Sequence, residues 1–548
     1  MNLHDELARP FNILADVSTP TRAPPRPRLT SDSIPLRARL VAATTAVTLA
    51  FAPAFAGIDI TRAQSVYMPA PAAPPLPSPP PLTLPDLGDA SQASFSPAQE
   101  RKLGETIIRQ ARAQGAFLDD PEVVDYLNML GNRLLASSRD ARQDFEFFAV
   151  PDNAVNAFAL PGGYIGVNTG LILLAQNESE LASVLAHEIT HVTQRHIARI
   201  LQAQQNSLLM SLATMALAIL AARAGGTSSG DAAQAAIATG QALMMQNQLN
   251  YTREFEYEAD RVGFQRLAAA GFDVRGSATF MERLQKSGRF LEGNTPSYLR
   301  THPVTFERIA EAQSRAEATP YKQVADSLDF HLVRALLRSY QGEAHEAVSF
   351  FELALAERKF NSEVAVRYGL VASLARAKEF KRAMSELATV EKMAPPHPMI
   401  EAIGAHVLLE SGDVERAITR IESALKRYPS KMQLVYDYPE ALLRAKRPAQ
   451  AASYIESQLL RFPGDGRLHR TAARAYADLD KRLKQHYHQG EFYAWRGDLK
   501  GAIVQCELAL KAGDANFYDS SVVETRLRAF RREAAEQEKE GFGRTAER

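Results

Sequence analysis

Residues 178–201 read ESELASVLAHEITHVTQRHIARIL, and we interpret this stretch as a single helix. Its central motif HEITH, at 187–191, places His187 and His191 four residues apart. Four residues advance a helix by slightly more than one turn, so both imidazoles project from the same face and can bind one Zn²⁺. Glu188 lies beside them, where a carboxylate can take a proton from a water molecule that the metal acidifies. The stretch therefore predicts a helix that carries the core of a metal site.

A catalytic zinc site needs a third protein ligand, and the acidic stretch REFEYEADRVG at 253–263 offers candidates. Glu256 and Asp260 are four residues apart and share one face of a predicted helix. One carboxylate can therefore bind the metal while the other holds a ligand histidine by a hydrogen bond. Spacing alone does not choose among the four acidic residues of the stretch, which also include Glu254 and Glu258. A solvent-exposed acidic face is the alternative interpretation.

Together the two motifs resemble the HExxH zinc metallopeptidase family that includes the CAAX prenyl protease and its bacterial relatives. The segment NAFALPGGYIGVNTGL at 156–171 adds to this resemblance. In layout the chain is similar to family members of the periplasm that join the peptidase to tetratricopeptide repeats. The resemblance implies that Glu256 is the third zinc ligand, that Glu188 is the catalytic base and that Asp260 supports a ligand histidine.

Two further histidines lie close to these motifs in the sequence. His302 stands in the segment THP at 301–303, and the resemblance implies that it is a regulatory fourth zinc ligand that blocks the open position of the metal. Its alternative role is an ordinary contact at a helix start. His196 follows His191 by five residues and lies off the zinc face of a continuous helix, which favours a structural role.

The front of the chain has a composition of its own, because 17 of the 30 prolines fall in the first 97 residues. Residues 40–56 form a short apolar run that follows two arginines and ends in Ala-Phe-Ala, which is typical of a secretory signal peptide. A single membrane anchor is the alternative. We expect an extended leader and signal peptide over 1–56, a proline-rich linker over 57–95, and export to the periplasm.

Residues 96–319 form the predicted peptidase domain, with a small β-sheet before the HEITH helix. Within it, residues 207–249 predict an apolar helical hairpin. Its first helix, 207–222, is short for a bilayer core of about 30 Å. We therefore favour a hairpin that packs over the site, and peripheral membrane contact through 207–222 is the alternative.

Residues 320–515 predict a tetratricopeptide-repeat domain, because small residues recur there with spacings of 36, 34 and 34 residues, and then of 51. These small residues are Ala347, Ala383, Ala417, Ala451 and Ala502. A turn residue stands five positions before each of them, namely Gly342, Lys378, Gly412, Lys446 and Gly497. Four or five helix pairs would stack into an α-solenoid with a concave groove for peptide or protein partners. Residues 516–548 form a predicted charged tail.

The composition limits the classes of protein that fit. The 63 basic and 63 acidic residues give a formal net charge of zero, so we expect no nucleic-acid partner. The only cysteine, Cys506, excludes an intramolecular disulfide and a four-cysteine zinc site, so a metal would be held by histidine and carboxylate. The predicted fold is mostly α: an α+β peptidase domain followed by an α-solenoid.

The resemblance implies a zinc endopeptidase of the cell envelope that binds one Zn²⁺ per chain through His187, His191 and Glu256. Its expected substrates are unfolded, misfolded or stalled outer-membrane proteins, and its repeats are expected to bind substrate or the outer-membrane assembly machinery. The alternative function is a chaperone-like adaptor for outer-membrane protein assembly whose proteolysis is largely latent.

Overall fold

The computed structural model describes residues 95–137, 144–203, 253–290 and 297–539. The predicted signal peptide, the proline-rich linker and the apolar hairpin at 207–249 lie outside these residues. Among the described residues, every helix is too short or too polar to cross a bilayer.

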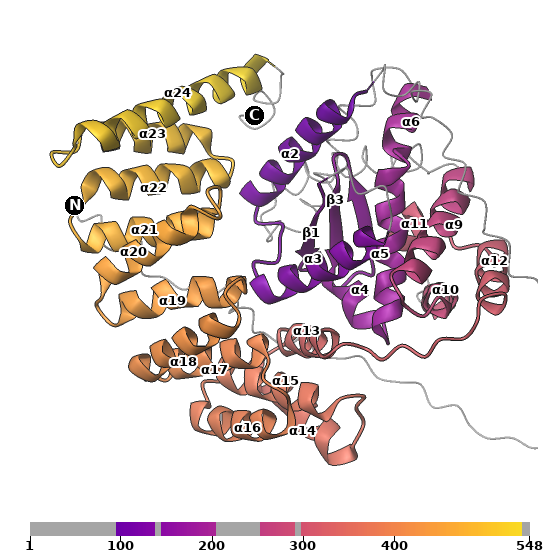
Figure 1. Cartoon of the computed structure of the whole chain (residues 1–548). Coiled ribbons are helices and arrows are strands. Elements are labelled where there is room, and N and C mark those ends of the chain that lie inside the picture. The colour runs from indigo at the N-terminus through magenta and orange to yellow at the C-terminus, as the bar shows by residue number, and fades with distance from the viewer. Residues whose placement is uncertain (1–94, 138–143, 204–252, 291–296, 540–548) are drawn as a thin grey trace, which may run out of the picture. The chain divides into compact units, whose positions relative to one another are not determined.

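A three-stranded sheet with the order β1-β3-β2 lies in the peptidase region (Figure 1). Strand β1 (Glu146–Val150) runs parallel to β3 (Tyr164–Asn168), and β2 (Ala157–Leu160) runs antiparallel to it. Gly162 and Gly163 form the turn between β2 and β3 with φ angles of 80° and 92°, which glycine adopts without steric cost. The small sheet expected before the HEITH helix is therefore confirmed.

Helices cover both faces of this sheet because successive side chains of a strand point to opposite sides. Phe147 packs into the main core with α3 (Pro121–Ala136) and α5 (Glu178–Thr193). Its neighbour Phe148 packs into a second cluster with α2 (Pro97–Ala113). The sheet thus supports α5, the helix that carries HEITH.

Six further helices complete the described part of the peptidase region: α4 (Thr169–Leu174), α6 (His196–Ala203), α9 (Arg253–Ala269), α10 (Arg275–Phe290), α11 (Ser297–Thr301) and α12 (Phe306–Glu317). Helix α9 packs closely on α5. A Cβ atom at Gly263 of α9 would lie 3.2 Å from backbone atoms of Ala186 and His187, so a glycine permits this approach. The close contact brings the acidic motif beside the histidine motif.

The prediction of one continuous helix from 178 to 201 is wrong at one point. Helix α5 ends at Thr193, and α6 begins at His196 after a break at Gln194 and Arg195. Arg195 has a φ of 54°, which lies in the left-handed region and is incompatible with a continuing α-helix. The chain therefore changes direction immediately after the second histidine of the motif.

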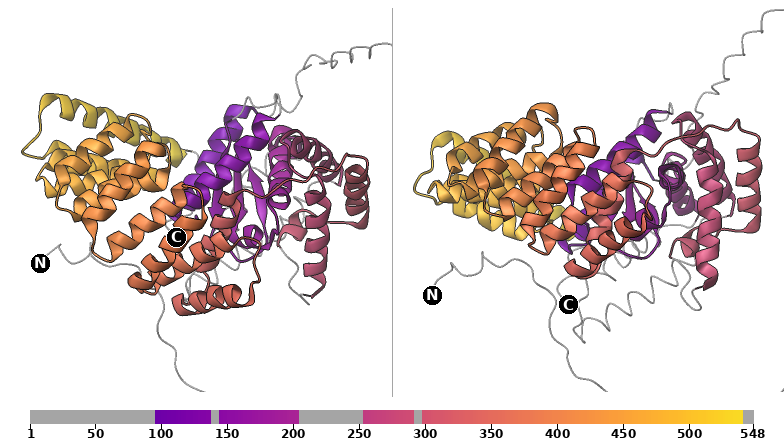
Figure 2. Two further views of the ribbon diagram at one scale, coloured as in Figure 1. Left: turned by 60° about the horizontal axis from the view of Figure 1, so that its bottom comes forward. Right: turned by 90° about the horizontal axis from the view of Figure 1, so that it is seen from below.

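Twelve helices follow in the described C-terminal part, and they form six consecutive pairs. They are α13 (Leu328–Ser339), α14 (Ala344–Glu357), α15 (Glu363–Arg376), α16 (Phe380–Met393), α17 (Pro398–Glu410), α18 (Val414–Arg427), α19 (Met432–Arg444), α20 (Pro448–Leu459), α21 (Gly466–Asp478), α22 (Arg482–Trp495), α23 (Leu499–Leu510) and α24 (Phe517–Lys539). In both further views the pairs, coloured from orange to yellow, follow one another in chain order (Figure 2). This is the expected tetratricopeptide-type solenoid, but the described residues form six pairs where four or five were expected.

The predicted turn residues of the repeats all have left-handed backbones, with φ angles from 59° to 88° at Gly342, Lys378, Gly412, Lys446 and Gly497. The five small alanines are all buried. One turn was missed: Asp480, 34 residues after Lys446, has a φ of 53° and joins α21 to α22. The 51-residue spacing before Ala502 thus includes helix α22.

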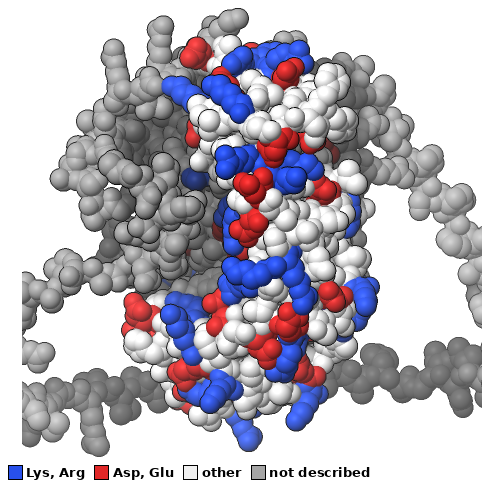
Figure 3. Space-filling view, turned by 90° about the vertical axis from the view of Figure 1, so that its left-hand side faces the viewer, with Lys and Arg blue, Asp and Glu red and all other residues white. Residues whose placement is uncertain are grey.

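Ion pairs connect neighbouring helix pairs of the solenoid. Arg444 contacts Glu410, and Arg474 contacts Glu440, with N–O distances of 2.8 and 2.7 Å. On the face that Figure 3 presents, basic and acidic side chains are interspersed rather than gathered by sign. The last helix, α24, lies within the segment expected as a charged tail, and its Phe530 packs into the cluster that α23 forms.

Candidate metal centre

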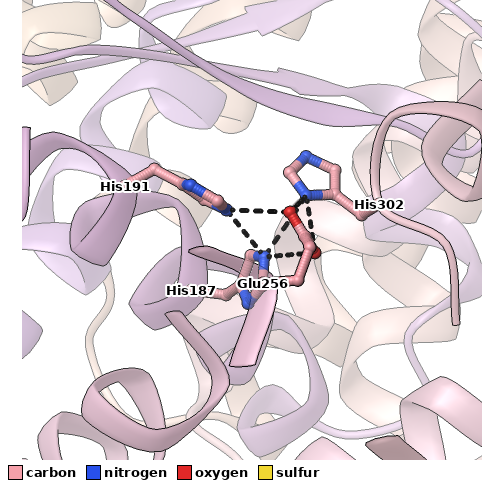
Figure 4. Close-up of side chains that lie close together, drawn as sticks. All are labelled: His187, His191, Glu256 and His302. Atoms are coloured by element: carbon pink, nitrogen blue, oxygen red, sulfur yellow. Dashed lines mark hydrogen bonds and ion pairs between the residues drawn. The ribbon is translucent and has the colours of Figure 1, made fainter. Parts of the chain in front are cut away.

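Four side chains from separate parts of the chain converge in the peptidase region (Figure 4). One ligand atom from each of His187, His191, Glu256 and His302 lies within 4.8 Å of all the others. The Nε2 atom of His187 lies 3.0 Å from Nε2 of His191 and 3.3 Å from Nδ1 of His302. Oε2 of Glu256 lies 3.5 Å from Nε2 of His187, and Oε1 lies 3.5 Å from Nε2 of His191. Around a tetrahedral zinc with bonds of about 2.0–2.1 Å, ligand atoms lie about 3.3 Å apart, so these spacings fit that metal.

Of the acidic residues that the sequence left open, the structure brings Glu256 into this cluster. Glu254 is exposed, and Glu258 binds Arg199 with an oxygen 2.9 Å from Nη1. Asp260 lies beside the cluster and accepts a hydrogen bond from Nδ1 of His187 at 3.0 Å. That bond leaves Nε2 of His187 to face the cluster, as a ligand histidine requires.

The cluster is buried, and its electrostatic environment favours a bound cation. All four of its residues are at most 5% exposed. Burial lowers the pKa of His187, but hydrogen bonds to Asp260 and Glu256 outweigh burial and raise that pKa to about 10. Burial raises the pKa of Glu256, but the positive charges of His302 and His187 hold it well below its usual range. A site that binds a proton this firmly favours positive charge, and a metal ion competes for the same lone pairs.

Glu188 is fully buried beside the ligand atoms. Its Oε1 atom lies 3.5 Å from Nε2 of His302, and the backbone N–H of Ala159 on β2 also interacts with the carboxylate. Burial raises the pKa of Glu188, and the charges of His302 and His187 oppose that shift. A buried carboxylate with so few polar contacts, beside a cluster of candidate metal ligands, is suited to proton transfer.

Sequence reasoning missed Arg308, which lies on α12. Its Nη1 atom lies 2.8 Å from Oε2 of Glu256, and its Nε atom lies 2.6 Å from Oδ2 of Asp260. Thr305 is the N-cap of α12, the helix that carries Arg308. This helix start was the only feature of the sequence that pointed to the segment. Nothing in the spacing connected Arg308 with the carboxylates of α9.

His302 enters the cluster, and His196 does not. Tyr298 stacks on His302 with ring centroids 4.7 Å apart, and the backbone N–H of His302 donates to the carbonyl of Tyr298 at 2.8 Å. His196 instead contacts the other ring nitrogen of His191, with 2.8 Å between the two Nδ1 atoms. Burial lowers the pKa of His196 to about 4, which leaves its ring neutral at pH 7.

Comparisons with known proteins match two separate parts of the chain. A model of peptidase family M48 matches residues 121–316, and a tetratricopeptide-repeat model matches residues 408–477. The putative beta-barrel assembly-enhancing protease of Vibrio cholerae is 38% identical over 328 residues, which cover 59% of this chain and 66% of that protein. The beta-barrel assembly-enhancing protease of Escherichia coli is 31% identical over 422 residues, which cover 77% of this chain and 85% of that protein.

A more distant similarity covers a smaller share of the chain. The mitochondrial metalloendopeptidase OMA1 of Arabidopsis thaliana is 32% identical over 177 residues, which cover 32% of this chain and 33% of that protein. The peptidase match over 121–316 contains every residue of the four-residue cluster.

Proposed function

The chain belongs to the family of the beta-barrel assembly-enhancing proteases, as a family M48 metallopeptidase with tetratricopeptide repeats, and we propose that it is a zinc-dependent endopeptidase of the periplasm. Its proposed substrates are misfolded or stalled outer-membrane proteins. The repeats are proposed to bind these substrates or the outer-membrane assembly machinery. The predicted signal peptide supports the location, and the solenoid supports a protein partner.

The observation that carries the proposal is the convergence of His187, His191 and Glu256 beside the buried carboxylate of Glu188. When bound, zinc supplies a Lewis acid that polarises the scissile carbonyl and lowers the pKa of a water molecule. The two histidines and Glu256 hold the metal, and Asp260 orients His187. Glu188 accepts the proton of the attacking water and later donates it to the leaving amine.

Strand β2 is the proposed binding edge for an extended substrate. Among the described strands it pairs with β3 alone, so no described strand occupies its other edge, which supports β-addition there. Strand β2 also packs against α5, which carries Glu188. A peptide added to this edge would therefore run past the catalytic base.

His302 is proposed as a regulatory fourth ligand. Its Nδ1 atom lies 3.0 Å from Oε1 of Glu256 and 3.3 Å from Nε2 of His187, which places it at the fourth corner of the cluster. Three histidines and one glutamate fill a tetrahedral site and leave no position for water. This arrangement supports a latent peptidase that becomes active when His302 withdraws.

The latent arrangement also favours a second function, a chaperone-like adaptor for outer-membrane protein assembly. A cell that lacks the protein and receives the Glu188→Gln variant separates the two. Full recovery of outer-membrane assembly supports the adaptor, and no recovery supports the protease.

The proposal is tested directly by cleavage of casein with the purified full-length chain. Glu188→Gln keeps the size of the side chain but removes its basic carboxylate, so we expect retained zinc and a rate at least about 100-fold lower. Glu254→Gln, at the exposed glutamate of α9, is the matched control and should cleave at the wild-type rate. A Glu188→Gln protein that cleaves casein normally would overturn the mechanism.

A further inference from the structure

His196 is engaged at both of its ring nitrogens. Its Nδ1 atom lies 2.8 Å from Nδ1 of His191, and its Nε2 atom lies 3.3 Å from Oε2 of Glu258. The ring is completely buried and stacks on Phe255, with centroids 4.6 Å apart and planes inclined by 17°. Glu258 is held in turn by Arg199, whose Nη1 lies 2.9 Å from the same Oε2. A chain of contacts thus leads from a metal-ligand candidate to a carboxylate outside the cluster.

A metal bound at the cluster would determine which nitrogen carries each proton. Nε2 of His191 faces the cluster, 3.0 Å from Nε2 of His187, so a metal would take its lone pair. A neutral His191 then carries its hydrogen on Nδ1 and donates it to Nδ1 of His196. His196 consequently carries its own hydrogen on Nε2 and donates it to Glu258. Each hydrogen bond in this chain has one donor and one acceptor.

The break between α5 and α6 makes this arrangement possible. In a continuous helix His196 would point away from His191, whereas the turn at Arg195 brings its ring back. Two nitrogens of Arg195 lie 3.1 and 2.8 Å from Oε1 of Glu100, and Nη2 lies 2.5 Å from the carbonyl oxygen of Phe95. A left-handed backbone strains a residue other than glycine, and these part-buried contacts hold Arg195 in place.

We infer that His196, held by Glu258, is the positioning residue that orients His191 for metal binding. Its part corresponds to that of Asp260, which orients His187 through the equivalent Nδ1 atom. Each ligand histidine of the HEITH motif then has its own partner: a carboxylate for the first and a histidine–carboxylate pair for the second. This inference rests on the proposed zinc site and adds a determinant of its affinity.

Zinc affinity is the quantity that tests the inference, measured on the full-length chain by competition with a chromophoric chelator. His196→Phe preserves the stacking on Phe255 but cannot accept the hydrogen bond, so the Kd for zinc should rise about 10–100-fold. His196→Asn places an amide oxygen near the position of Nδ1 and should bind zinc within a few-fold of wild type. Glu258→Leu, which leaves His196 itself in place, should raise the Kd by a smaller factor.

Two controls separate orientation from packing. Phe255→Leu disturbs the surroundings of His196 but not its hydrogen bond, so the zinc Kd should stay within about twofold. Thermal unfolding in EDTA shows whether each variant folds without metal, and Glu258→Leu decides the question if His196→Phe does not fold.

The results distinguish failure of the inference from failure of the zinc site. If the wild-type chain binds no zinc, the proposed function itself is wrong. If wild type binds zinc and His196→Phe binds it equally well, the positioning role is wrong. A His196→Asn variant no better than His196→Phe, or a Phe255→Leu variant equally weakened, would assign the effect to packing and also overturn the inference.

Discussion

Arg308 donates two hydrogen bonds to the carboxylate of Asp260: Nε lies 2.6 Å from Oδ2, and Nη2 lies 2.8 Å from Oδ1. Asp260 also accepts the Nδ1 hydrogen of His187 at 3.0 Å. The guanidinium of Arg308 on α12 therefore positions the ring of His187 on α5 through the carboxylate of Asp260 on α9. The same guanidinium contacts Glu256, so one cation balances the carboxylates of both Glu256 and Asp260.

Removal of this cation should strongly destabilise the peptidase region. Arg308→Ala leaves two buried carboxylates without their partner, and we expect a loss of about 3–5 kcal/mol in the free energy of unfolding. Arg308→Lys should lose less free energy of unfolding, because lysine keeps the positive charge although it cannot make the bidentate hydrogen bonds. Urea unfolding in EDTA measures these losses without a contribution from metal binding.

Arg315, on the exposed side of the same helix, provides the control. It pairs with Glu311 one turn away, and such surface pairs contribute at most about 1 kcal/mol. Equal effects of Arg308→Ala and Arg315→Ala would contradict the central place of Arg308.

Removal of His302 should activate the enzyme. In His302→Ala the fourth corner of the cluster is open to water, so we expect casein cleavage to increase several-fold. The double variant with Glu188→Gln should be inactive, which would assign the gain to this site. A lower rate in His302→Ala would show that the histidine takes part in catalysis instead of restraining it.

Acidification should weaken the repeat domain through a buried histidine pair. The Nδ1 atoms of His469 and His488 lie 2.8 Å apart. Burial, followed by the charges of His469 and Lys484, holds the pKa of His488 well below its usual range. The unfolded chain takes up this proton near pH 6.5 and the folded chain does not, so stability is lost as pH falls below about 6.5.

The free energy of unfolding should fall by about 1.4 kcal/mol per pH unit through His488, until the pH reaches the pKa of His488 in the folded chain. Urea unfolding at pH 7.5 and 5.5 measures it. His488→Phe should reduce the difference between the two pH values, whereas His345→Gln, at an exposed site, should preserve it. An unchanged difference in His488→Phe would exclude this histidine as the cause.

Glycine at a left-handed turn of the repeats should stabilise the chain. Lys446 has a φ of 59°, where a residue with a Cβ atom is strained by about 1–2 kcal/mol. Lys446→Gly relieves this strain at a cost in chain entropy, so we expect a net gain of about 0.5–1 kcal/mol. Lys426→Gly, in the last turn of α18, should instead lose up to about 1 kcal/mol. Thermal unfolding compares the two, and a destabilised Lys446→Gly chain would refute the argument.

The parts that local spacing determines were predictable from the sequence. The four-residue spacing placed His187 and His191 on one helix face. The repeat period placed Lys378 and Lys446 at turns, because the two helices of each repeat are joined at the same position. Asp480 escaped notice because Gln485, five positions later, is not a small residue, so the period was carried on to Ala502.

The parts that depend on contacts between distant segments were not predictable. Arg308 meets Asp260 only because α12 packs against α9. His196 reaches His191 only because the chain turns at Arg195, and contacts with Glu100 and Phe95, about 95–100 positions earlier, hold that turn. No local pattern records either relationship.

The zinc content of the purified full-length chain tests the central claim most directly. Elemental analysis after dialysis should find about one zinc per wild-type chain, and about one in Glu254→Ala, whose side chain is exposed. Glu256→Ala lacks the proposed third ligand and should retain far less than one. Equal zinc in Glu256→Ala and wild type, or none in wild type, would contradict the account.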